Sequence, residues 1–192
     1  MTAAADLRLD FTQPPQVLAR RLIGARLTLD GVGGRIVETE AYDAGDPASH
    51  SFSGPSARNA AMFGPVGRAY VSRIYGVHLC LNVVCGPEPG GAVLIRAIEP
   101  LVGIEDMRIR RGADAPRALC AGPGRLCQAL GVTMAHNHVS LTAEPFVLEP
   151  PVAPLDIAVG PRIGITKAVD RPWRFALAGS AYVSRRFPGP GA

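Results

Sequence analysis

The alternation of apolar and polar residues predicts paired β-strands in the N-terminal half of the chain. LTLD and RIVETEAY flank a glycine-rich turn, and AYVSRIYGVHLCLNVVC contains two β-rich runs on either side of Tyr75 and Gly76. Short turns of this kind join antiparallel strands, so both stretches predict β-hairpins. Further strands are expected over residues 92–100 and, in the C-terminal third, at VSL, FVLE, IGI and WRFAL.

Helical patterns are few and short. Residues 14–24 begin with prolines, which the first turn of a helix tolerates, and end at Gly24 with apolar residues at helical spacing between. Residues 101–111 and 123–131 predict two further helices, the second opened by proline and closed by glycine. Clustered strands with few helices predict an α+β fold with a mainly antiparallel curved sheet, short helices and a protruding β-hairpin.

A chain of 192 residues is expected to form one domain, residues 1–192, and its 22 glycines and 18 prolines predict many turns. Residues 1–10 and 187–192 have linker-like composition and are expected to be flexible. The sequence shows no export signal and no apolar run long enough for a membrane span. We therefore expect a soluble cytoplasmic monomer, nucleoid-associated if bacterial, with no membrane partner.

The four cysteines predict buried free thiols, because a protein that is not exported normally keeps its thiols reduced. A zinc site is the alternative, but no C-x-x-C pair is present and the spacing fits zinc ribbons poorly. His136 and His138 in AHNH are interpreted as part of a polar loop. The four cysteines are Cys80, Cys85, Cys120 and Cys127.

The charge is moderately basic, with 20 Lys and Arg against 16 Asp and Glu, a net charge of +4 and a pI near 9.2. Such a balance favours a polyanionic partner, since basic residues that neutralise phosphates release counterions. All the basic residues except Lys167 are arginine, which a coding bias would also explain. Charge alone therefore does not decide the function.

RIVETEAY carries the first candidate chemistry. The strand period places Ile36, Glu38, Glu40 and Tyr42 on one face and the intervening residues on the other. An ordinary solvent-exposed strand face is one interpretation. The other is a carboxylate that acts as a general base beside an aromatic wall.

The second candidate is the expected hairpin tip at Tyr75. Hairpin tips usually carry small polar residues, so a large aromatic there either packs on a neighbour or projects toward a partner. A protein that extrudes a nucleotide from a duplex needs such a side chain to fill the gap in the base stack. Packing in the core remains the alternative.

Eight ordered motifs, covering about Leu18 to Ser184, resemble the alkyladenine (3-methyladenine) DNA glycosylase family. This resemblance implies a base-excision repair enzyme that flips an alkylated purine out of double-stranded DNA and hydrolyses its N-glycosidic bond. It also implies an abasic product and no metal or organic cofactor. Lys167, the only lysine, is not part of any of these motifs, so a Schiff-base step is not expected. The motifs are RIVETEAY, DPASHS, SARNAAMFGPVGRAYV, IYGVHLCLN, VLIRAIEP, LCAGPGRLCQALG, PRIGI and PWRF.

By this resemblance, Glu40 is the general base that deprotonates the attacking water. Arg96 and the backbone carbonyl of Ile163 would hold that water. Tyr42 would stack on one face of the flipped base, and His50 would contact it from the other side.

The resemblance also implies the contacts with DNA. Tyr75, at a tip shared with Gly76 and Val77, would insert into the duplex. Asn82 would disfavour normal guanine by crowding its exocyclic amino group. Arg125, near a helix start, would contact a phosphate, although a solvated arginine is the alternative.

The chain departs from the family pattern at Ser72, where many members carry a second stacking tyrosine, and at Val77, which replaces a bulkier residue. Phe52 is a candidate for the missing wall. An incomplete wall penalises least those lesions whose glycosidic bond is already weak. We therefore expect a preference for cationic alkylpurines such as 3-methyladenine.

Two rival functions follow from the same residues. A non-catalytic binder of distorted DNA would use the tyrosine hairpin without needing Glu40. A hydrolase of free nucleosides would need Glu40 and have no use for Tyr75 or the positive charge.

Overall fold

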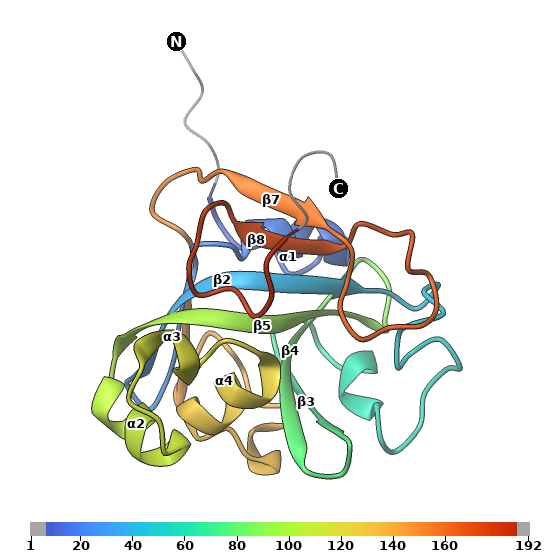
Figure 1. The fold of residues 1–192 in the computed structure, drawn as a ribbon. Coiled ribbons are helices and arrows are strands. Elements are labelled where there is room, and N and C mark those ends of the chain that lie inside the picture. Colours follow the sequence, from blue (N-terminus) through green and yellow to red (C-terminus); the bar gives the residue numbers. More distant parts are fainter. Residues whose placement is uncertain (1–6, 188–192) are drawn as a thin grey trace.

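The protein is built on one antiparallel β-sheet of eight strands, seen in a computed structural model that describes residues 7–187 (Figure 1). The main path of the sheet runs in the order β3-β4-β5-β2-β1-β6, and β8 pairs with both β2 and β7. The antiparallel α+β fold expected from the sequence is confirmed. The strands are β1 (Arg26–Leu29), β2 (Val32–Tyr42), β3 (Ala69–Ile74), β4 (His78–Cys85), β5 (Gly91–Val102), β6 (Phe146–Glu149), β7 (Ile157–Gly160) and β8 (Arg174–Leu177).

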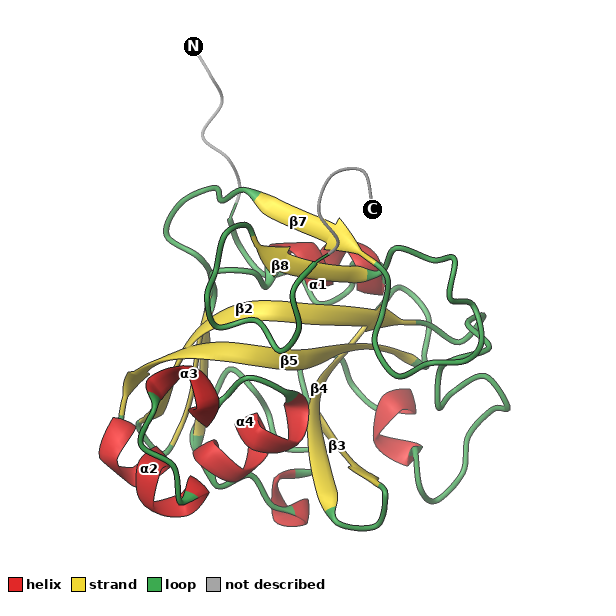
Figure 2. Cartoon of the chain, in the orientation of Figure 1, coloured by secondary structure: helices red, strands yellow, loops and turns green. Residues whose placement is uncertain are grey.

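Strand β2 lies at the centre of this sheet. It pairs with β5 along most of its length on one side, while the other side pairs first with β1 and then with β8. Figure 2 shows β2 and β5 as two long strands that cross the middle of the molecule, with β7 and β8 above them. The C-terminal half of β2 is thereby enclosed by strands from distant parts of the sequence.

A β-bulge interrupts the regular alternation of β2. Ile36 and Glu38, two residues apart on β2, pair with adjacent residues of β5. Val37 between them is therefore left without a partner on β5. Ile36 joins Ala41 in the hydrophobic core, away from the two glutamates. The expectation that Ile36 shares their face was wrong, because the extra residue of a bulge reverses the alternation.

Both predicted hairpins form, and each turns through residues with positive φ. Asp30 and Gly31 connect β1 to β2 with φ of 49° and 77°, and Tyr75 and Gly76 begin the β3–β4 turn with φ of 49° and 74°. Glycine adopts this conformation readily, whereas a tyrosine adopts it only where the surroundings require it. The β3–β4 hairpin projects from the sheet at the bottom of Figure 1.

The three predicted helices form, although each is shorter than expected. Leu101 and Val102 continue β5, so the helix expected from residue 101 begins at Ile104. Helices α2, α3 and α4 pack together beside β5, whereas α1 packs on β2 and β5 (Figure 1). Helix α3 was not predicted. The helices are α1 (Pro15–Arg21), α2 (Ile104–Arg111), α3 (Pro116–Leu119) and α4 (Pro123–Leu130), with 3₁₀ turns at Ala60–Phe63 and Met134–His136.

The C-terminal third follows the prediction only in part. FVLE and most of WRFAL form β6 and β8, but VSL contributes a single bridge at Ser140 and IGI lies in a loop. Those two strand predictions were wrong, because a run of only three residues makes a strand only where a neighbouring strand offers hydrogen-bond partners. Strand β7 was missed, and it pairs only with β8 at the border of the sheet.

The four cysteines are free and buried, and burial raises the pKa of Cys80 to about 11. No group of three or more metal-ligating side chains gathers within residues 7–187. In the same range no helix is long and apolar enough to cross a membrane. Of the end segments expected to be flexible, residues 1–6 and 188–192 lie outside the described range. Leu9 packs against the core, and Phe187 lies against Arg174.

Candidate active site

A cavity of about 480 Å³ opens at the C-terminal end of β2, between β4, β5, the β3–β4 hairpin and the loops around residues 48–50 and 163–165. Residues that the sequence placed in separate motifs meet here. Glu40 lies directly behind the wall and bonds to three of the lining residues. The predicted site residues that line the cavity are Tyr42, His50, Ser72, Tyr75, Asn82, Arg96 and Ile163.

The carboxylate of Glu40 is fully buried and held by three donors. The backbone N–H of Ile163 donates to Oε1 at 2.7 Å. The Tyr42 hydroxyl and Arg96 Nη1 donate to Oε2 at 2.8 Å and 3.2 Å. The structure therefore joins the three residues of the expected catalytic group, with Ile163 contributing its N–H to Glu40, and adds the hydroxyl of Tyr42 to them.

Burial raises the pKa of Glu40 above its ordinary value, while Arg96, the Ile163 N–H and the Tyr42 hydroxyl oppose that rise. Burial and the neighbouring Glu40 also raise the pKa of Tyr42, so its hydroxyl remains a donor. Burial would lower the pKa of Arg96, but Glu40 and Glu38 more than offset it. The site thus contains a carboxyl group whose pKa is raised by burial beside a permanent cation, which suits a general base.

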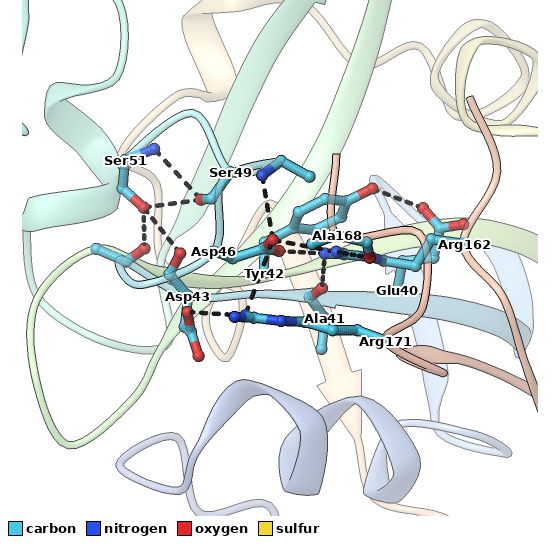
Figure 3. Close-up of polar contacts among 12 residues, drawn as sticks. Glu40, Ala41, Tyr42, Asp43, Asp46, Ser49, Ser51, Arg162, Ala168 and Arg171 are labelled. Carbon is cyan, nitrogen blue, oxygen red and sulfur yellow. Dashed lines mark hydrogen bonds and ion pairs between the residues drawn. The ribbon is translucent and has the colours of Figure 1, made fainter. Parts of the chain in front are cut away.

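The ring of Tyr42 rests on a buried ion pair (Figure 3). The guanidinium carbon of Arg162 lies 4.7 Å from the centre of the ring. Nη1 and Nη2 of Arg162 both donate to the Asp46 carboxylate, and both side chains are fully buried. Arg162 Nη1 also donates to the Ala41 carbonyl at 3.0 Å. Because one face of the ring packs on Arg162, the opposite face is the one on which a planar base can stack.

His50 is fixed from two directions. Its Nδ1 lies 2.8 Å from the Tyr70 hydroxyl, and its backbone carbonyl accepts a hydrogen bond of 2.7 Å from Asn59 Nδ2. Burial and then Arg58 lower the pKa of His50, which favours the neutral imidazole at pH 7. A neutral ring in a fixed orientation can contact a base without adding charge to the cavity.

Ser72 lies on β3 with its side chain buried in the cavity wall, where it adds no aromatic surface. Phe52 does not line the cavity, and 49% of its surface is exposed. Tyr70, two residues before Ser72 on the same strand, does line it. The aromatic residues of the wall are therefore Tyr42, Tyr70 and Tyr75, from three different positions around the cavity.

The hairpin tip is open to solvent. Tyr75 is 85% exposed and Val77 is 75% exposed, so neither belongs to the core. The turn is closed by the Val77 N–H, which donates to the Ile74 carbonyl at 3.3 Å. Tyr75 also borders the cavity, whereas Gly76 and Val77 do not. A large exposed ring next to a cavity of this size can enter the space that an extruded group leaves.

Asn82 and Arg125 complete the predicted set. Asn82 is buried on β4, where its Nδ2 donates to the Tyr70 carbonyl at 2.9 Å, and it borders the cavity. Arg125 lies exposed in the first turns of α4 and does not line the cavity. This helix packs closely on the hairpin, since a Cβ added at Gly124 would lie 3.3 Å from His78 Cβ.

Residues 9–181 match the model of the methylpurine-DNA glycosylase family. The chain belongs to this family. A relative from Nitrosospira multiformis is 59% identical over 183 residues, which cover 95% of each chain. A second, from Granulibacter bethesdensis, is 58% identical over 178 residues, which cover 91% of this chain and 84% of the relative. Both carry the provisional name of a 3-methyladenine DNA glycosylase, and the resemblance inferred from the motifs is confirmed.

As a DNA glycosylase, the protein is a hydrolase that acts on N-glycosyl bonds. Sequence reasoning missed several residues that shape the site of this glycosylase. Arg162 and Arg174 stand in the PRIGI and PWRF motifs, but their partners Asp46 and Glu38 lie more than a hundred residues earlier in the chain. Ser184, which contacts Glu38 and Arg96, carried no signal beyond its place near the end of the resemblance.

Proposed function

We propose that this glycosylase flips an alkylated purine from duplex DNA into the cavity and hydrolyses its N-glycosidic bond with a water activated by Glu40. The reaction leaves an abasic site, and the enzyme acts as a monomer. The observation that carries the proposal is the buried Glu40 carboxylate, held by Arg96, Tyr42 and Ile163 at the wall of a cavity of about 480 Å³.

Cleavage of the bond between base and sugar builds positive charge on the sugar. An ionised carboxylate at Glu40 can stabilise that charge and take a proton from the attacking water. Arg96 favours the ionised form of Glu40. The backbone carbonyl of Ile163 is proposed to orient the water together with Arg96.

Three further residues support the binding of a flipped base. Tyr42 offers the face of its ring that is not packed on Arg162, and His50 approaches with a neutral imidazole. Asn82, fixed by its bond to the Tyr70 carbonyl, is proposed to crowd the exocyclic amino group of normal guanine.

The hairpin tip supports action on a duplex. We propose that Tyr75 fills the gap left by the flipped nucleotide, with Gly76 and Val77 beside it in the groove. Arg125, exposed on a helix that packs against this hairpin, is proposed to contact a phosphate.

The two rival functions fit the geometry less well. A binder without catalysis would gain nothing from burying Glu40 behind a cavity wall, because an ionised carboxylate is costly to bury. A hydrolase of free nucleosides would have no use for a tyrosine that is 85% exposed on a hairpin tip. The only lysine, Lys167, is exposed and does not line the cavity, which supports hydrolysis without a Schiff base.

The substitution Glu40→Gln tests the proposed general base. We expect single-turnover release of methylated purines from dimethyl sulfate-treated duplex DNA to fall by about a hundredfold to ten-thousandfold, because the amide cannot accept the proton. Affinity for a lesion duplex should change little, since the shape is kept. Near-normal excision by this variant would refute the assignment.

Glu38→Gln shows which carboxylate is the base. If Glu40 is the base, the excision rate of this variant still falls at acid pH, because Glu40 still has to ionise. If Glu38 is the base, the decline disappears. The melting temperatures of both variants show whether the fold is intact.

The lesion preference is proposed to lean toward cationic alkylpurines because Ser72 leaves the wall open. Neutral lesions depend more on alignment, where small misplacement costs about a hundredfold in rate. We expect faster single-turnover excision of 3-methyladenine than of hypoxanthine or ethenoadenine. Ser72→Tyr should raise excision of the neutral pair. A folded Ser72→Tyr variant that gains nothing would show that another group, with Tyr70 the nearest aromatic on the strand, already fills the space.

A further inference from the structure

Glu38 is a second buried carboxylate that the proposed chemistry leaves unused. Its surface is fully buried, yet it accepts four hydrogen bonds. Arg96 Nε donates to Oε1 at 3.2 Å and Arg174 Nε at 2.7 Å. The Ser184 hydroxyl donates to Oε1 at 2.9 Å, and its backbone N–H donates to Oε2. A carboxylate with this many charged and neutral donors is an anchor for the groups around it.

Arg96 lies between the two carboxylates and divides its donors among three partners. Its Nε donates to Glu38, its Nη1 to Glu40 and its Nη2 to the Ser184 hydroxyl, at 3.2, 3.2 and 3.3 Å. An arginine side chain has several rotatable bonds, and holding it in one orientation costs conformational entropy. Glu38 and Ser184 fix the guanidinium so that Nη1 faces Glu40.

Ser184 belongs to a segment that three contacts tie down. Arg174 Nη2 donates to the Arg185 carbonyl, and its guanidinium carbon lies 3.9 Å from the centre of the Phe187 ring. Phe187 also packs on Gly160 of β7, where an added Cβ would lie 2.9 Å from the ring. Residues 184–187, here called the C-terminal strap, thus run from the carboxylates to the outer strand β7.

We infer that the C-terminal strap is a positioning element of the active site, in which Ser184, together with Glu38 and Arg174, fixes Arg96 against Glu40. This inference rests on the proposed role of Glu40. Without the Ser184 hydroxyl, Nη2 of Arg96 loses its acceptor and Glu38 loses one donor. Arg96 then holds Glu40 less tightly, and the carboxylate becomes harder to ionise.

Several charged or titratable groups face Glu40 and can affect its pKa. Of these, Arg96, Arg162 and Glu38 are charged, while Tyr42 and Cys80 carry raised pKa values and stay neutral near pH 7. Arg96 and Glu38 are the two of these groups that bond to the strap, both through Ser184. The charged or titratable groups that face Glu40 are Arg96 from β5, Glu38 and Tyr42 from β2, Cys80 from β4 and Arg162 from the loop after β7.

The test compares Ser184→Ala with Ser184→Thr and Ser180→Ala. Threonine keeps the hydroxyl, and Ser180 is a nearby serine outside the strap whose hydroxyl accepts a hydrogen bond from the Tyr182 N–H. In single-turnover release of methylated purines from duplex DNA, Ser184→Ala should lose about ten- to a hundredfold, the range expected for hydrogen bonds to charged partners. Ser184→Thr should restore the rate, and Ser180→Ala should match the wild type.

The second readout is independent of excision. Titration of the Glu40 carboxyl by ¹³C NMR, with the signal assigned through Glu40→Gln, should give a higher pKa in Ser184→Ala than in the wild type. Equal titrations of Glu40 in these two proteins would overturn the role of the strap. A shifted titration, combined with full excision by Glu40→Gln, would support the strap and refute Glu40 as the base.

Discussion

The two ends of the cavity are built in opposite ways. At one end, Glu38, Glu40, Arg96 and Arg174 form a carboxylate centre in which every charged group is at most 7% exposed and bonded to another. At the other end, the tip of the β3–β4 hairpin presents Tyr75 with 85% of its surface exposed. A group that handles protons has to be held in place beforehand, whereas a group that enters DNA has to be free until DNA arrives.

This contrast extends to stability. The charged groups of the carboxylate centre are desolvated, so each is stabilised by its partners. Removal of one group leaves another charge buried and unpaired. The hairpin tip has little to lose, because the side chains of Tyr75 and Val77 are mostly exposed to solvent. Substitutions at the two ends should therefore separate into those that change both folding and chemistry and those that change DNA recognition alone.

The largest effect is expected for Arg96→Met, which removes the cation that bonds to both Glu38 and Glu40. We expect a loss of about 3–5 kcal/mol in the free energy of unfolding at pH 7, as for other broken buried ion pairs. Excision should also fall at least as far as in Glu40→Gln. Urea unfolding and single-turnover release of methylated purines measure the two losses.

The sign of the pH dependence checks the cause. Arg96 lowers the pKa of Glu40, so its removal raises that pKa further above the unfolded value. The folded variant then binds a proton that the unfolded chain releases, so its deficit is largest near pH 7 and shrinks toward acid pH. Arg26→Met, which breaks an exposed pair with Glu149, should cost about 1 kcal/mol or less. Equal losses in the two variants would contradict a buried charge network.

The second prediction concerns the acid side of the rate profile. Excision requires ionised Glu40, whose pKa is raised by burial above 4.5, so the rate should fall about tenfold per pH unit below a midpoint that lies above 4.5. Tyr42→Phe keeps the ring and removes a hydrogen bond that lowers this pKa, so the midpoint should move to higher pH. A midpoint that does not move would show that another group limits the rate.

Prediction from the sequence succeeded where the signal was local. Alternation and glycine turns located both hairpins, and the motif around Glu40 placed the acid and Tyr42 two residues apart on one face. The β-bulge at Val37 could not be predicted, because it depends on how β5 pairs with β2. The same holds for the contact of Ser184 with Glu38, which joins positions 146 residues apart through the path of the C-terminal strap.

The smallest of the three effects is expected at the hairpin tip. Tyr75→Ala should weaken binding to a lesion duplex by about five- to a hundredfold, since a stacked aromatic contributes about 1–3 kcal/mol per base. The melting temperature should not change, because the side chain is almost fully exposed. Tyr75→Phe keeps the ring and should bind as the wild type does.

A single-stranded substrate separates the two places that Tyr75 can occupy, since the residue also borders the cavity. If the ring fills the gap in a base stack, Tyr75→Ala should impair excision from duplex DNA and leave excision from a single strand unchanged. A single strand has no duplex base stack in which a gap would have to be filled. If both substrates suffer equally, Tyr75 acts as a wall of the cavity. A sharp fall in melting temperature with unchanged affinity would instead mean that the tip is part of the folded core, which would remove the contrast with the carboxylate centre.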